Sequence, residues 1–170
     1  CLSCHMADKE DGDSFEHYGE RIATIVSPKD CGQCHEKETK EFSASHHAKA
    51  AEFIGSLDNF LGVAVEGAPA AILGCQQCHG STVEVGAEGR PKPEGWPNTG
   101  IGRVNPDGSK GACTACHARH GFSAAQARRP ESCGKCHMGP DHPRREGCRD
   151  SKYGVVNEEH KERQRPENEK

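Results

Sequence analysis

One pentapeptide, Cys-x-x-Cys-His, occurs five times in this chain of 170 residues. Its copies begin at Cys1, Cys31, Cys75, Cys113 and Cys133. The starts of consecutive copies lie 30, 44, 38 and 20 residues apart, which is too irregular for a solenoid of fixed repeat length. The motifs use ten of the eleven cysteines, so they constrain the fold more than any other feature.

The residue types of the motif indicate covalent attachment of haem. Two thiols separated by two residues lie about one helical turn apart, which matches the vinyl groups of a haem, and the adjacent histidine can bind the iron. Zinc ribbons do not require a histidine after every cysteine pair, and iron–sulfur clusters use other spacings. A disulfide framework is the remaining alternative. We predict five haem c groups, attached through Cys1, Cys4, Cys31, Cys34, Cys75, Cys78, Cys113, Cys116, Cys133 and Cys136, with the proximal ligands His5, His35, His79, His117 and His137.

The composition supports an interior that is filled by something other than aliphatic side chains. Leu, Ile, Val and Phe supply only 22 residues, below the fraction of about 20% at which globular cores become doubtful. The net charge of −4 is too small for a disordered chain. Porphyrins are large, flat and apolar. We therefore predict a mainly α-helical cytochrome with extensive loops and a core built from haems.

Local signals predict a few helices and one long loop. Residues 27–30 read as an N-cap, a proline at the first helical position and an acidic third position, and residues 36–53 continue in helix-forming residues. Residues 118–129 predict a short helix that is stopped by Pro130. Seven glycines and four prolines predict a long loop over residues 81–111.

The domain and partner predictions follow from charge and hydropathy. We expect one multihaem domain over residues 1–156 and a charged tail over residues 157–170. No stretch approaches the ~18 apolar residues of a membrane-spanning helix, and the nearly even charge balance does not indicate nucleic acid. Because c-type haem is attached outside the cytoplasm, we expect a periplasmic or extracellular location. The expected partners are redox proteins, and a homo-oligomer or larger assembly fits such a chain.

Histidines outside the motifs are candidates for the second axial position of each iron. Met6 and Met138 directly follow motif histidines and lie on the wrong side of their own haems, so bis-histidine ligation is the expected pattern. We predict His17, in a helix-like stretch, His47 in preference to its neighbour His46, and His120 as distal ligands. His160 reads as a surface residue of the tail and Cys148 as a spare thiol.

Asp141 and His142 form a different kind of candidate. Prolines on both sides stiffen this pair, and a carboxylate held beside an imidazole suits proton transfer at a substrate-binding iron. We predict a catalytic role for both residues. The alternative is that His142 is one more axial ligand and Asp141 a turn residue.

Several segments together resemble one family, the hydroxylamine oxidoreductase-like octahaem cytochromes. The segments are residues 28–31, 45–48, 96–103, 113–120, 127–131 and 136–143. The likeness runs from Cys1 to about Gly154. It implies that Cys113, Cys116 and His117 hold a substrate-binding haem without a protein ligand on its distal face. It also implies that Asp141 and His142 handle substrate protons there, while the other haems conduct electrons.

The chain also departs from this family. The family has eight haems, and its last three motifs and its cross-linking tyrosine lie beyond the end of this chain, which therefore resembles either the N-terminal five-haem portion or a shortened relative. Where the family tends to have a histidine in a Ser-Lys-His-Gly stretch, this sequence has Tyr153. Two hypotheses follow. One is an enzyme that oxidises hydroxylamine or hydrazine, or reduces nitrite, at an open haem. The other is a pure electron-transfer cytochrome with only bis-histidine haems.

Overall fold

The structure is a computed structural model that describes residues 1–6, 11–54, 64, 67 and 74–138. Five residues with predicted or alternative roles, together with the predicted tail over residues 157–170, lie outside this part: Asp141, His142, Cys148, Tyr153 and His160. The chain divides into two units, Cys1–Phe122 and Ser123–Lys170, which are described separately. The predicted boundary at residue 156 stays a prediction. Within the described part, no helix has the length and apolar character needed to span a membrane.

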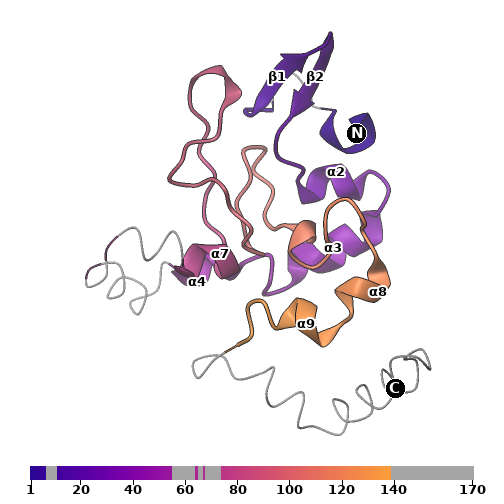
Figure 1. Ribbon diagram of the computed structural model, residues 1–170, viewed down its shortest axis with the longest axis vertical. Coiled ribbons are helices and arrows are strands. Elements are labelled where there is room, and N and C mark those ends of the chain that lie inside the picture. The colour runs from indigo at the N-terminus through magenta and orange to yellow at the C-terminus, as the bar shows by residue number, and fades with distance from the viewer. Residues whose placement is uncertain (7–10, 55–63, 65–66, 68–73, 139–170) are drawn as a thin grey trace, which may run out of the picture. The chain divides into compact units, whose positions relative to one another are not determined.

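The first unit begins with a single-turn helix and a hairpin (Figure 1). Helix α1, Leu2–His5, carries the first motif. Strands β1, Ser14–His17, and β2, Glu20–Ala23, pair antiparallel. The prediction of a helix-like stretch around His17 is wrong, because the connecting residues Tyr18 and Gly19 both have positive φ. This backbone conformation folds the chain back into a two-residue hairpin turn.

The second motif begins in helix α2, Pro28–Gly32, and the predicted start of this helix is confirmed. The Ser27 hydroxyl accepts from the amide of Lys29 at 3.0 Å, and the amide of Ser27 donates to the Asp30 carboxylate at 2.7 Å. These two reciprocal bonds form a capping box. Pro28 occupies the first position, where its missing N–H costs nothing.

The helix predicted over residues 36–53 is interrupted. Helix α3 spans Glu36–Ala44 and helix α4 spans Ala50–Ile54. At Ser45 the backbone is extended, and its hydroxyl donates to the carbonyl of Phe42 at 2.6 Å. A serine side chain that bonds the backbone locally competes with the helical ladder, and this accounts for the break.

The predicted loop over residues 81–111 is confirmed as a long, mostly irregular segment that follows helix α7, Gln76–His79. It contains one short 3-10 helix, η2, Ala87–Gly89, and isolated bridges that pair Thr82 and Lys110 with Val104. A Cβ on Gly80 would lie 2.4 Å from the amide nitrogen of Arg103. The loop therefore returns tightly against the end of the third motif.

The short 3-10 helix η3, Cys113–Ala115, carries the start of the fourth motif. In the second unit, helices α8, Ala124–Ala127, and α9, Pro130–Cys133, lead into the fifth. The helix predicted over residues 118–129 is therefore mostly absent: Phe122 has a φ of 45°, and Ser123 then caps α8 anew. Pro130 begins α9 at its first position and does not simply stop the preceding helix.

The apolar interior of the described residues is very small. The buried apolar side chains are Ala23, Ile25, Ala48, Ala50, Val83 and Ala112. Ile25 is the largest of them, and no large side chain is fully buried. The longest described helix, α3, has nine residues. The loop-rich part of the predicted fold class is thus confirmed, while its helical part holds only for short segments.

Candidate haem centres

Each motif folds as one helical turn. In the first, second, fourth and fifth motifs the carbonyl oxygen of the first cysteine accepts from the amides of both the second cysteine and the histidine. For the fourth motif these N···O distances are 3.3 Å to Cys116 and 3.0 Å to His117. In the third motif Cys75 has helical dihedral angles and precedes α7. One turn places the two thiols on the same side, as attachment to one porphyrin requires.

The surroundings of the motifs fit a large apolar group. Each of the ten motif cysteines is exposed or half-buried, so a porphyrin could reach it. Around the first motif, Leu2, Met6 and Phe15 are exposed apolar side chains. Met6 bridges to Ile22, which is also the cross-strand partner of Phe15. Neighbouring exposed apolar side chains form a surface that a bound porphyrin would cover.

Two of the predicted proximal histidines are held by buried segments. The Nδ1 of His5 lies 2.9 Å from the carbonyl oxygen of Ala23, and the Nδ1 of His79 lies 3.3 Å from that of Ala50. An Nδ1–H that donates to a carbonyl fixes the ring and leaves Nε2 for a metal. Both alanines are buried. This arrangement supports the predicted ligand roles of both histidines.

The second and fourth motifs meet in the first unit. The Cys31 thiol donates a hydrogen bond to the sulfur of Cys113, although 82 residues separate them. This contact and the positive charge of Arg103 lower the pKa of the Cys113 thiol, although burial opposes the shift. The same contact and burial raise the pKa of Cys31. The attachment points of two haems are therefore adjacent.

One short loop segment, residues 101–103, joins the third and fourth motifs. The amides of Ile101 and Gly102 donate to the carbonyls of Cys78 and His79, both at 3.0 Å. The carbonyls of Ile101 and Arg103 in turn accept from the amides of Ala112 and Gly111, at 2.9 and 2.6 Å. Because residues 111–112 directly precede Cys113, this segment fixes the two motifs relative to each other.

Arg103 itself is a buried residue that the sequence analysis did not single out. It is 4% exposed. Its guanidinium donates to the side-chain oxygen of Asn105 at 2.6 Å and to the carbonyls of Asn98 and Val26 at 3.2 and 3.0 Å. The guanidinium carbon lies 5.6 Å from the centre of the Trp96 ring. Burial, with the nearby charge of Arg119, lowers the pKa of Arg103 to about 10, so it stays charged at neutral pH.

The predicted distal ligands are accessible. His17 ends β1 and is exposed, with its ring 4.5 Å from that of Tyr18. His46 and His47 are exposed in the turn between α3 and α4, and His120 is exposed near the end of the first unit. Their roles as axial ligands stay predictions.

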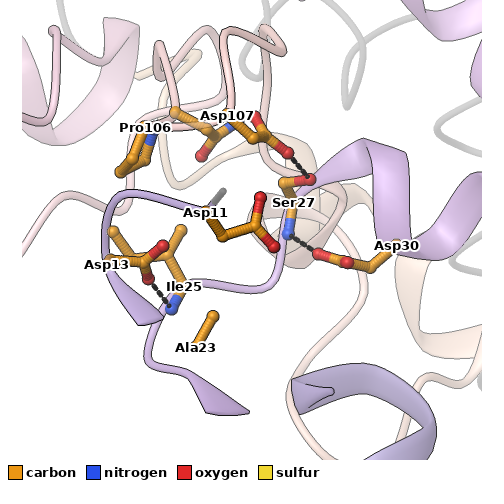
Figure 2. Close-up of a pocket in the computed structure, with 9 residues that line it drawn as sticks. Asp11, Asp13, Ala23, Ile25, Ser27, Asp30, Pro106 and Asp107 are labelled. Atoms are coloured by element: carbon orange, nitrogen blue, oxygen red, sulfur yellow. Dashed lines mark hydrogen bonds between the residues drawn. The ribbon is translucent and has the colours of Figure 1, made fainter. Parts of the chain in front are cut away.

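A small acidic pocket lies beside α2 (Figure 2). The Asp13 carboxylate accepts from the amide of Ile25 at 2.8 Å, and the Ser27 hydroxyl donates to the Asp107 carboxylate at 2.6 Å. Burial raises the pKa of Asp13 and of Asp30. Within the described residues, no group of three or more His, Cys, Asp or Glu side chains is arranged to hold a metal ion. We interpret this pocket as structural.

Comparison with known proteins agrees with this geometry. Residues 1–168 match a family model described as "Seven times multi-haem cytochrome CxxCH". The chain belongs to the multi-haem cytochrome CxxCH family. Membership confirms that the motifs attach haem c covalently and that the protein transfers electrons. The number of five haems stays a prediction.

Two similar proteins, one compared by sequence and one by structure, are informative about this cytochrome. It is 31% identical over 169 residues to the "Probable nitrite reductase-hydroxylamine oxidoreductase fusion protein" of Kuenenia stuttgartiensis, covering 96% of this chain and 15% of that protein. A solved structure described as "Hypothetical multiheme protein" matches with a TM-score of 0.76 and 37% identity, covering 92% of this chain and 34% of that one. The cytochrome thus spans a minor part of both relatives. The resemblance found in the sequence is confirmed.

Proposed function

We propose that this cytochrome carries five haems and works outside the cytoplasmic membrane as part of a hydroxylamine oxidoreductase-like enzyme. In this proposal the haem at Cys113, Cys116 and His117 has an open site for a small nitrogen compound, and the other haems exchange electrons with redox partner proteins. Asp141 and His142 would move substrate protons at that site. The hypothesis covers oxidation of hydroxylamine or hydrazine and reduction of nitrite.

The contact between Cys31 and Cys113 is the observation that carries the proposal. It brings the attachment point of the second haem against that of the fourth. Residues 101–103 hold the third motif against the segment before Cys113 as well. A haem that reacts with substrate needs neighbours that remove or supply electrons. The fourth motif has two such neighbours among the described residues.

The residues of the fourth motif have separate roles. Cys113 and Cys116 would fix the porphyrin, and His117 would hold the iron from the proximal side. A bound haem supplies an iron that gains or loses one electron at a time. The relative with nitrite reductase and hydroxylamine oxidoreductase in its name supports a reaction on a small nitrogen compound. The open distal side at this motif rests on the family resemblance. The proton-transfer roles of Asp141 and His142 rest on the family resemblance and on their chemistry.

The number of haems can be tested by mass spectrometry of the chain produced with c-type haem maturation. We expect a mass that corresponds to five haems. Replacing Cys113 and Cys116 by alanine should remove one haem, and so should replacing Cys133 and Cys136. A wild-type mass with fewer than five haems would contradict the count.

The open site can be tested by electron paramagnetic resonance of the same samples. We expect a high-spin ferric signal in the wild type that changes when cyanide or nitrite is added. The signal should be lost in the Cys113/Cys116 variant and kept in the matched Cys133/Cys136 variant. Only low-spin signals in the wild type, insensitive to both anions, would reject the enzyme hypothesis.

Pure electron transfer is the second candidate function. The observation that favours it is the supply of histidines, since six lie outside the motifs and could provide one distal ligand for every haem. His17, His47 and His120 are accessible enough to serve. In that case every haem would be low-spin. The same spectra therefore separate the two functions.

A further inference from the structure

Arg103 carries a buried positive charge to which no carboxylate of the described residues is bonded. Its three hydrogen bonds all end on neutral oxygens, those of Asn105, Asn98 and Val26. The ion pairs formed within the described part of the chain lie at the surface, and none of them involves Arg103. Burying a charge costs free energy unless an opposite charge is paired with it. A buried charge that is kept without such a pair is therefore a candidate for a functional role. Its burial therefore calls for an explanation.

Two acidic side chains attract Arg103 without forming an ion pair with it. Asp13 and Asp107 act on Arg103 only through longer-range attraction. Their carboxylates are bonded elsewhere, Asp13 to the amide of Ile25 and Asp107 to Ser27 and Ser109. Within the described residues, the attraction that Arg103 feels from acidic groups therefore acts at longer range and not through an ion pair.

The position of this charge relates it to haem attachment. The carbonyl of Arg103 accepts from Gly111, two residues before Cys113. Its guanidinium also bonds Val26, which directly precedes the cap of α2 and the second motif. Buried surroundings weaken charges less than water does, so a fixed cation acts strongly on neighbouring groups. Arg103 also interacts electrostatically with Cys113, so a haem attached at Cys113 and Cys116 would bring a group that changes charge toward this cation.

We propose that Arg103 is a positioning residue whose fixed positive charge raises the reduction potential of the haem attached at Cys113 and Cys116. Reduction adds one electron to the ferric iron, and a nearby cation stabilises the more negative reduced state. The proposal requires a haem at the fourth motif but not an open iron. It therefore holds for the enzyme and for the pure electron-transfer cytochrome alike.

A purely structural role is the competing explanation. The planar guanidinium ties together three loop segments, which a lysine could not do with the same geometry. If that is the whole role, Arg103→Lys and Arg103→Gln should alter the protein equally. If the charge matters, the lysine variant should keep the potential while the glutamine variant lowers it.

The test is a spectroelectrochemical titration of the haem-loaded chain. Arg103→Gln should shift the midpoint of one haem to lower potential, and Arg103→Lys should leave it near the wild-type value. Arg90→Gln is the matched control on the same loop, because Arg90 is largely exposed, and it should change nothing. In the variant without Cys113 and Cys116, Arg103→Gln should have no effect on the remaining haems.

A second variant keeps the proposal testable if Arg103→Gln does not load its haems. Asn105→Asp leaves the arginine in place and sets a carboxylate against its Nε, 2.6 Å away in the wild type. Neutralising the charge in this way should lower the same midpoint. An unchanged midpoint in a fully loaded Arg103→Gln or Asn105→Asp variant, or an equal shift in the glutamine and lysine variants, would overturn the proposal.

Discussion

Replacing Ser27 by alanine should weaken the junction between the second motif and the acidic pocket. Ser27 is 3% exposed, so water cannot replace the two bonds that its hydroxyl makes. Losing the cap on Lys29 costs about 1 kcal/mol, and losing the bond to the charged Asp107 costs about 1.5–3 kcal/mol. The free energy of unfolding should therefore fall by about 3 kcal/mol at neutral pH.

The pH dependence of this loss gives a sharper test. Burial alone would raise the pKa of Asp107, but hydrogen bonds from Ser109 and Ser27 outweigh it and hold the pKa below its usual value. A carboxyl with a lowered folded pKa adds stability above its unfolded pKa of about 3.9 and loses it as pH falls through the folded value. The difference in the free energy of unfolding between the wild type and Ser27→Ala should therefore become smaller as the pH falls below about 4.

The assay is urea unfolding of the haem-loaded chain, followed by far-ultraviolet circular dichroism at neutral and acidic pH. Ser43→Ala is the matched control, since Ser43 is exposed on α3 and its hydroxyl bonds only the carbonyl of Thr39. Its effect should stay below about 0.5 kcal/mol. The reasoning is refuted if Ser27→Ala costs no more than this control, or if its cost is the same at both pH values.

Two other substitutions test separate parts of the fold. Gly80→Ala should prevent the first unit from folding normally, because the new Cβ would lie 2.4 Å from the backbone of Arg103. Gly19→Ala is the control, since Gly19 has a similar positive φ but no atom lies within 4 Å of its added Cβ. It should lower the free energy of unfolding by only about 1–2 kcal/mol in the same urea assay. Burial raises the pKa of Asp13, so its protonated form favours folding at low pH and this contribution is lost as the pH rises through the folded pKa. Asp13→Asn should reduce that loss of stability, and an unchanged pH profile would contradict this role for Asp13.

Features that depend on near neighbours could be predicted from the sequence. The capping box at Ser27 needs only the next three residues, and each motif turn is closed within five. Predictions failed where a single residue redirects the backbone. Ser45 breaks the helix expected over residues 36–53, and the positive φ of Tyr18 turns the stretch before it into a strand. Helix propensity summed over a window does not register such local events.

Contacts between distant residues could not be predicted in this way. Arg103 is buried because it bonds Val26, 77 residues earlier in the chain. The meeting of Cys31 and Cys113 likewise depends on how the intervening loop returns. Periodicity and composition carry no information about which loop packs on which motif. The sequence predicted the loop over residues 81–111 and the family resemblance included residues 96–103, but neither predicted these contacts.

In the first, second, fourth and fifth motifs, the Cys-x-x-Cys-His turn is closed by hydrogen bonds within the motif itself. The two hydrogen bonds that close the turn join residues of the pentapeptide, and the same pattern occurs in the motifs at α1, α2 and η3 although their surroundings differ. The connecting segments, and not the motif turn itself, therefore decide where each haem lies.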